Sequence, residues 1–154
     1  MENIWRTLNN EIPIFLAEII DKYNFSVIKI SDLKTALVQD DFSIIISIER
    51  FAAIAEYAFV GADNHIIVYS FDNFISSKFN EQDREGLTNA QNAEEWVSNS
   101  LIILKNGLLS KWKAILKGEK GWITDFEKSP WFAIRDATED EKKKLENDLS
   151  INAD

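Results

Sequence analysis

The feature that most restricts the fold is a run of isoleucine, valine and aromatic residues from Asp41 to Phe71, interrupted once by Gly61-Ala62-Asp63-Asn64. β-Branched and aromatic residues favour strands, and a short Gly/Asp/Asn segment between two such runs is typical of a turn. The three consecutive isoleucines from Ile44 indicate a strand buried on both faces. We therefore predict an antiparallel meander at the centre of a small sheet, with residues 51–60 as a strand despite their alanines.

Two long amphipathic segments flank this run. Apolar residues at spacings of three and four predict a helix over residues 10–23, preceded by a leading turn. Pro13 leaves open a second possibility, a helix that is kinked at this proline. Another helix is predicted over residues 93–117, with Asn92 as its N-cap and Gly118 at its end. If both helices cover the same face of the sheet, the other face must meet the C-terminal tryptophan region or a partner.

The remaining segments complete the predicted domain. Residues 25–30 and 36–39 are expected to be strands, and residues 120–126 a further strand or an extended arm. Residues 76–92 are polar and predict the longest loop, while the capping box from Thr138 to Glu141 predicts a charged, loosely docked helix near 139–149. We expect one α+β domain over 1–154, in which an antiparallel meander sheet of about 4–5 strands packs against an N-terminal helix and a long helix in the C-terminal half.

Charge and composition restrict the function. The net charge of −9 opposes nucleic-acid binding, because a phosphate backbone is held by Lys/Arg surfaces. The absence of cysteine excludes disulfides and thiolate chemistry. The sequence has no apolar run as long as a membrane span, and its first residues do not resemble a signal peptide. We expect a soluble cytoplasmic protein that binds neither nucleic acid nor membrane and whose charge suits a basic partner.

Residues suited to catalysis are scarce. His65 is the only histidine, it lies beside a turn, and the sequence contains neither a nucleophile elbow nor a glycine-rich phosphate loop. Asp40 with Asp41, or Asp63 with Asn64, could bind a hard cation, but neither pair has calcium-loop spacing, and turns favour the same residue types. We therefore predict no enzyme activity, no cofactor and no metal site.

Acidic and aromatic residues offer a surface for a protein partner instead. Tryptophan is common at the energetic centre of interfaces, and carboxylates attract a basic partner. Carboxylates gather in the polar loop and at the start of the following helix, and another ends the most apolar strand, where it forms either an ion pair or part of a recognition face. The candidate partner-binding residues are Glu49, Glu81, Asp83, Glu85, Glu94, Glu95, Trp96 and Trp131.

Residues 1–75 resemble a group of small bacterial proteins. The resemblance rests on the leading helix, on Tyr23-Asn24-Phe25 and on a long strand ending in Ile48-Glu49-Arg50. In that group a Tyr-Gly-Phe helix exit precedes a meander with a Glu-Arg or Asp-Arg strand end, and here Asn24 replaces the glycine, which the left-handed conformation tolerates. The group includes immunity proteins of polymorphic-toxin and contact-dependent inhibition systems. The resemblance implies a toxin-binding function and carries over no individual site residue.

Three functions follow from these observations. The leading hypothesis is a small acidic binding domain that occludes a basic toxin domain. The first alternative is a structural or adaptor protein, including a homo-oligomer that buries its tryptophans. The second is a small enzyme with a carboxylate site, which a pocket lined by two or more convergent carboxylates would favour. The oligomeric state is left open.

Overall fold

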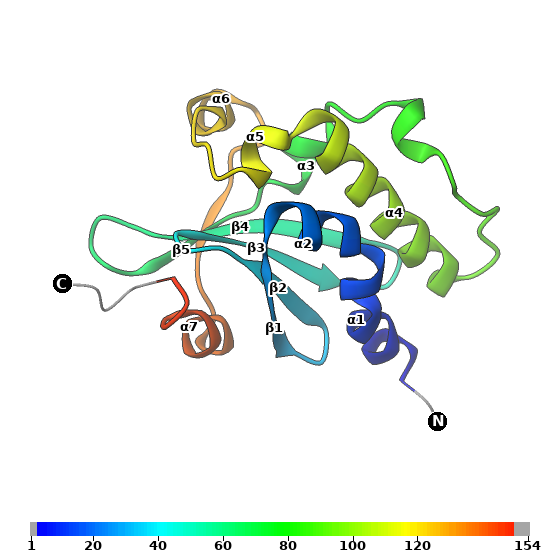
Figure 1. The fold of residues 1–154 in the computed structure, drawn as a ribbon, viewed down its shortest axis with the longest axis horizontal. Coiled ribbons are helices and arrows are strands. Elements are labelled where there is room, and N and C mark those ends of the chain that lie inside the picture. Colours follow the sequence, from blue (N-terminus) through cyan, green and yellow to red (C-terminus); the bar gives the residue numbers. More distant parts are fainter. Residues whose placement is uncertain (1–2, 150–154) are drawn as a thin grey trace.

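Within residues 3–149, which the computed structural model describes, six antiparallel strands form one open sheet in which each strand pairs with its neighbour in sequence (Figure 1). The α+β class and the antiparallel meander are therefore confirmed. β4 also confirms a strand within residues 51–60. The strands are β1 (Ser26–Ser31), β2 (Lys34–Val38), β3 (Phe42–Ile48), β4 (Ala53–Val60), β5 (Ile66–Tyr69) and β6 (Ile134–Asp136).

The central strand β3 is buried on both faces, as its isoleucines predict. Ile44 pairs with Tyr57 and Ile46 with Ala55, and these residues belong to the larger core. Ile45 points to the opposite face, because successive strand residues alternate, and it belongs to a second, smaller core. The sheet is thus the middle layer of the molecule, and both of its faces need a cover.

The two long amphipathic segments cover the same face of the sheet. The first forms α1 (Ile4–Phe15) and α2 (Ala17–Tyr23), and the second forms α4 (Ala93–Lys111) and α5 (Lys113–Leu116). Their buried residues share the larger core with the aromatic side chains of β3, β4 and β5. Figure 1 shows α4 and α2 on one side of the sheet and α7 on the other.

The other face is covered by the last helix, α7 (Glu139–Leu145), and not by the tryptophan region. Leu145 and Leu149 pack on this face, together with Ala137. The sequence analysis expected α7 to be loosely docked because it has few apolar residues. In the structure, Glu141 is also fully buried and ion-paired, so that the helix has a polar anchor in addition to its leucines.

The segment after Gly118 differs from the prediction. Residues 120–126 are not a strand or an extended arm: α6 (Trp122–Lys128) is a helix. Trp122 and Phe126 are four residues apart, so that a helix brings both side chains to one face, where they pack against Tyr69. The chain then returns along β5 as the edge strand β6, which the sequence analysis did not predict.

Both long helices are interrupted. The N-terminal one begins at Ile4 with Asn3 as its N-cap, not near Asn10, and Pro13 lies inside it. Pro13 cannot donate to the carbonyl of Asn9, and Thr35 Oγ1 of β2 lies 3.5 Å from that oxygen and 2.8 Å from Asn9 Oδ1. The C-terminal one breaks at Trp112, whose indole Nε1 donates to the Ile75 carbonyl at 2.9 Å. The second break thus coincides with a side chain that is held by a buried hydrogen bond.

The polar segment 76–92 follows the short helix α3 (Asp72–Ser76) and contains the 3-10 helix η1 (Glu81–Arg84). It is attached to α4 at two places. Asn106 Nδ2 donates to the carbonyls of Asp83 and Glu85, and Asn99 exchanges hydrogen bonds with the backbone of Thr88. The predicted loop thus lies along α4 and builds one wall of a hollow beside it.

Candidate functional site

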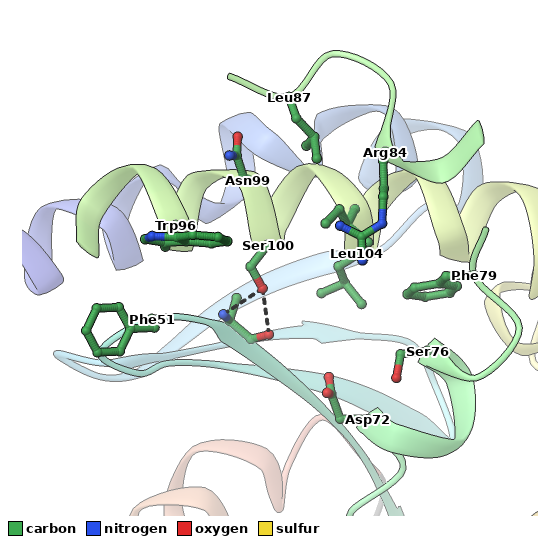
Figure 2. Close-up of a pocket in the computed structure, with 12 residues that line it drawn as sticks. Phe51, Asp72, Ser76, Phe79, Arg84, Leu87, Trp96, Asn99, Ser100 and Leu104 are labelled. Carbon is green, nitrogen blue, oxygen red and sulfur yellow. Dashed lines mark hydrogen bonds between the residues drawn. The ribbon is translucent and has the colours of Figure 1, made fainter. Parts of the chain in front are cut away.

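A hollow of about 260 Å³ lies between α4 and the start of β4. Figure 2 shows α4 and the 84–87 segment on one side of it, and β4 with α3 on the other. We call it the Trp96 hollow. The side chains that matter most here are Phe51, Asp72, Phe79, Arg84, Trp96 and Leu104.

Two aromatic side chains lie at one end of the Trp96 hollow and are only half covered. Phe51, in the turn between β3 and β4, is 55% exposed, and Trp96, in the first turn of α4, is 54% exposed (Figure 2). The Arg50 guanidinium lies 5.2 Å from the centre of the Phe51 ring. Exposed aromatic residues beside an apolar hollow are typical of protein-binding surfaces.

The start of α4 is built by local capping, which fixes the position of Trp96. Asn92 Oδ1 accepts a hydrogen bond from the Glu95 backbone N–H at 2.9 Å, and Glu95 Oε1 accepts one from the Gln91 N–H at 2.8 Å. These bonds satisfy backbone donors that a helix start leaves unpaired. The Glu95 carboxylate therefore serves the helix, whereas Glu94 is exposed.

A carboxylate lies on the β4 side of the hollow. Asp72 Oδ1 accepts a hydrogen bond from the Ala55 N–H at 2.9 Å. Burial raises the pKa of Asp72 above its ordinary value; the Ala55 hydrogen bond opposes this shift, and the charges of Glu49 and Glu56 add to it. Within residues 3–149, Asp72 forms no ion pair and its Oδ2 has no hydrogen-bond partner. The hollow thus contains a partly buried acid that is ion-paired with no cation among the described residues.

Across the hollow, the 79–87 segment supplies Phe79, Arg84 and Leu87. A Cβ at Gly107 would overlap the Phe79 ring, so glycine at this point of α4 lets Phe79 pack against the helix as part of the wall of the hollow. Gly107 lets α4 approach Phe79, and not the sheet. Asp83, one residue before Arg84, is buried and points away toward Ser110 and Lys111.

The predicted site residues fall into separate places. Trp96 lies at the hollow, with Glu94 and Glu95 in the same helical turn, whereas Glu49 lines a different depression with Trp5 and Leu33. Glu81 and Glu85 are exposed on and after η1. Trp131 is 42% exposed in the connection from α6 to β6, which lies at the opposite end of the molecule from the start of α4 (Figure 1).

Asp83 has a structural role. Burial would raise its pKa, but hydrogen bonds from Ser110, from the Asn80 N–H and from Lys111 outweigh that effect and lower the pKa. Its carboxylate also caps η1 through the Asn80 N–H, which lies 2.9 Å from Oδ2. This carboxylate is occupied within the fold.

The sequence analysis missed Phe51, Asp72 and Arg84. A signal existed for Phe51, because it directly follows the strand-ending pair Glu49-Arg50, and large apolar residues are unusual in an exposed turn. The sequence around Asp72 predicts the start of a short helix and gives no indication of a site. Its place in the hollow depends on the pairing of β4 with β5, which brings α3 beside the start of β4.

A second cluster of charges lies on the opposite face of the sheet. Arg135 contacts Glu56 and Glu141 with N–O distances of 2.7 Å each, and Lys34 contacts Glu141 at 3.1 Å. Burial would raise the pKa of Glu141, but hydrogen bonds from Arg135, the Thr138 N–H and Lys34 outweigh it and hold the pKa at about 2. Because each acid is paired, this cluster fastens α7 to the sheet.

Carboxylates of the described residues line more than one depression: Glu18, Asp83 and Glu85 share an open one beside α4, in which Asp83 is already bound by Ser110 and Lys111. Residues 3–149 contain no group of three or more His, Cys, Asp or Glu side chains placed to hold a metal ion. The Trp96 hollow is lined by one carboxylate among these residues, Asp72. His65 is exposed in the β4–β5 turn.

No protein-family model, curated protein or solved structure matches this chain. Between residues 3 and 149, no helix has the length and apolar character needed to cross a membrane.

Proposed function

We propose that this chain is a small acidic protein-binding domain that acts in the bacterial cytoplasm as an immunity protein, neutralising a basic toxin domain by binding and occluding it. The observation that carries the proposal is the half-exposed pair Phe51 and Trp96 at the Trp96 hollow. Such aromatic residues contribute most of the binding energy in many interfaces. The net charge of −9 supports a basic partner.

The proposed mechanism has two parts. The negative field of the domain, to which the exposed Glu94 contributes beside the hollow, accelerates encounter with a positively charged surface. Phe51 and Trp96 then lose their remaining exposure against the partner, and the burial of apolar surface slows dissociation. The bound domain covers the toxin surface that its substrate would need, and no chemistry by this chain is required.

The test is protection of cells from the toxin encoded beside the gene of this protein. We expect co-expression of this chain to restore growth and the purified toxin domain to bind it with an affinity that falls as salt is added. Trp96→Ala and Phe51→Ala are expected to weaken binding, whereas Trp131→Ala, which removes a similarly exposed tryptophan at the other end of the molecule, should not. The proposal fails if no toxin is encoded there or if the chain does not protect.

A second candidate function is that of a structural protein that assembles as a homo-oligomer, and the edge strand β6 favours it. Phe132 and Ile134 are 41% and 53% exposed beside Trp131, and β6 pairs with a neighbour on one side through β5. A strand edge that is unpaired on one side and flanked by exposed apolar side chains can pair with a second copy, although Arg135 and Asp136 make β6 itself mostly charged. Sedimentation at increasing concentration would reveal a dimer, and Ile134→Lys should abolish it. If Trp131→Ala abolishes toxin binding and Trp96→Ala does not, the toxin interface lies at this edge and not at the Trp96 hollow.

A further inference from the structure

The Trp96 hollow has a chemistry that the proposed function leaves unexplained. An interface anchored by aromatic residues alone does not need an acid, yet Asp72 lines the hollow from the β4 side. One carboxylate oxygen accepts the Ala55 N–H, and the other has no partner within residues 3–149. This second oxygen is not among the fully buried unpaired atoms of the described residues, so an incoming donor can reach it.

The charges around Asp72 favour a cation. The nearby groups that act on it electrostatically are two further carboxylates, Glu49 and Glu56. Glu56 is bound to Arg135 on the opposite face of the sheet, so it is not available to pair with an incoming group. Glu49 is exposed. A positive group that reaches the β4 side of the hollow would therefore meet a carboxylate oxygen without a protein partner, with two further carboxylates nearby and Arg84 on the opposite wall.

The size and the walls of the hollow favour a side chain over a cofactor. Its volume of about 260 Å³ is below the range of about 300–1,000 Å³ that is usual for small-molecule sites. Phe51 and Trp96 flank one end from opposite sides (Figure 2). Among cationic side chains, arginine packs well against aromatic rings and is less strongly hydrated than lysine, so that it loses less than lysine on entering such a place.

We infer that the Trp96 hollow receives one arginine side chain of the partner, which enters past Trp96 and Phe51 at one end and whose guanidinium donates to Asp72 Oδ2. This inference rests on the proposed function, because it names the residue type through which the basic partner is held. It also gives Arg84 a role. Arg84 lines the hollow from the side opposite Asp72 and forms no ion pair within the described chain, so its like charge weakens the binding of an incoming arginine and limits the hollow to one cation.

The test uses acetyl-arginine methylamide as the probe, with acetyl-citrulline methylamide as a neutral control of nearly the same shape. Nuclear magnetic resonance of the full chain should show saturable shifts at the Trp96 indole and the Ala55 amide with the arginine probe and much weaker ones with citrulline. Asp72→Asn should weaken binding by about tenfold or more, because a charged hydrogen bond is lost. Its Oδ1 can still accept from Ala55, and an unchanged unfolding midpoint would show that the fold is intact. Asp125→Asn, an exposed acid on α6, is the control and should have no effect.

Arg84→Ala separates this inference from its closest rival, a zwitterionic or anionic ligand. Removal of a like charge should tighten binding of the arginine probe, whereas a ligand that uses Arg84 would bind more weakly. Equal binding of citrulline, a full response in Asp72→Asn, or weaker binding in Arg84→Ala would overturn the inference. If the probe binds as expected but no toxin is found, the site stands and the immunity function fails. If the toxin binds and Asp72→Asn changes neither its affinity nor that of the probe, the immunity function stands and the inference fails.

Discussion

At the scale of single residues, acidic side chains of the same type have different roles in this fold. Glu94 and Glu95 are adjacent acids in the same helical turn, yet Glu95 caps α4 and Glu94 is exposed. Asp83 and Asp72 are both partly or fully buried, yet the first is bound by Ser110 and Lys111 while the second has no ion pair within residues 3–149. The exposed or unpaired acids, and not the acidic composition as a whole, are therefore the ones available to a partner.

Tyr57 gives a prediction at this scale. Its ring is central to the aromatic core and contacts Phe42 and Trp122, but its hydroxyl is buried without a hydrogen-bond partner among the described residues. Burial also raises the pKa of this phenol. Tyr57→Phe should keep the packing and remove an unsatisfied polar group, so we expect the free energy of unfolding to rise by about 1 kcal/mol. Urea unfolding measures it, and a loss of stability would mean that the hydroxyl has a partner in solution.

At the scale of elements, the sequence predicted what depends on neighbours along the chain. The isoleucine run predicts β3, and Asn92 and Thr138 predict the starts of α4 and α7. Asn24 is predicted to adopt the left-handed conformation, and it does so with φ of 62°. Features that depend on distant partners were missed. β6 exists because it pairs with β5, and the indole at the Trp112 break binds the distant Ile75 carbonyl, so no local pattern reports either contact.

The same reasoning explains how much of the site could be predicted. Trp96 was singled out from its residue type and its place near a helix start. Phe51 and Asp72 were not, because the packing of α4 beside the β3–β4 turn brings Phe51 to Trp96, and the pairing of β4 with β5 brings Asp72 into the same hollow. A sequence pattern can nominate an exposed aromatic residue, but it cannot show which acid faces it across a hollow.

Helix α4 gives an element-scale prediction at Gly107. Alanine normally stabilises a helix interior over glycine by about 1 kcal/mol. Here its Cβ would overlap the Phe79 ring, and overpacking costs about 1–3 kcal/mol. We expect Gly107→Ala to lower the free energy of unfolding and to displace Phe79 from the wall of the hollow. In a Phe79→Ala background, Gly107→Ala should instead be neutral or stabilising, and equal effects in both backgrounds would contradict this packing.

Helix α7 gives a second element-scale prediction, which concerns how the stability of the fold depends on pH. The folded-state pKa of Glu141, about 2, lies below its ordinary value of 4.5, so its contribution is complete above about pH 4.5 and is lost as the pH falls toward 2. The shift corresponds to about 3 kcal/mol at neutral pH. Asp83, whose pKa is also lowered in the fold, likewise loses its stabilising contribution as the pH falls. Asp72 has a raised pKa, so its protonation favours the folded state and partly offsets this loss of stability.

Glu141→Gln should therefore destabilise the protein by about 3 kcal/mol at neutral pH and should flatten the loss of stability below pH 4.5. Glu139→Gln is the matched control, because Glu139 lies in the same turn of α7 and is 95% exposed in its side chain; a change below about 0.5 kcal/mol is expected. Urea unfolding at a series of pH values measures both variants. An unchanged pH dependence in Glu141→Gln would show that other carboxylates cause the acid sensitivity.

At the scale of the whole molecule, the sheet separates two kinds of surface. α7 and its ion pairs close one face, and the other carries the helices and, at the start of α4, the Trp96 hollow. The net charge of −9 acts over the whole surface, whereas the aromatic pair acts only on contact. Long-range charge governs the rate of association, and short-range burial governs the rate of dissociation, so the two contributions can be separated kinetically.

This separation gives a last prediction, which rests on the proposed toxin partner. In stopped-flow binding, Glu94→Gln should lower the association rate constant modestly and leave the dissociation rate constant nearly unchanged, because Glu94 is exposed and charge alone is removed. Trp96→Ala should do the opposite and raise the dissociation rate constant by about tenfold or more, as expected for an aromatic anchor. Added salt should slow association of the wild type and of Trp96→Ala by the same factor, because screening acts on the field and not on the contact. If salt acts mainly on dissociation, or if Glu94→Gln and Trp96→Ala change the same rate constant, the negative field and the aromatic contact are not independent and the two-part mechanism is wrong.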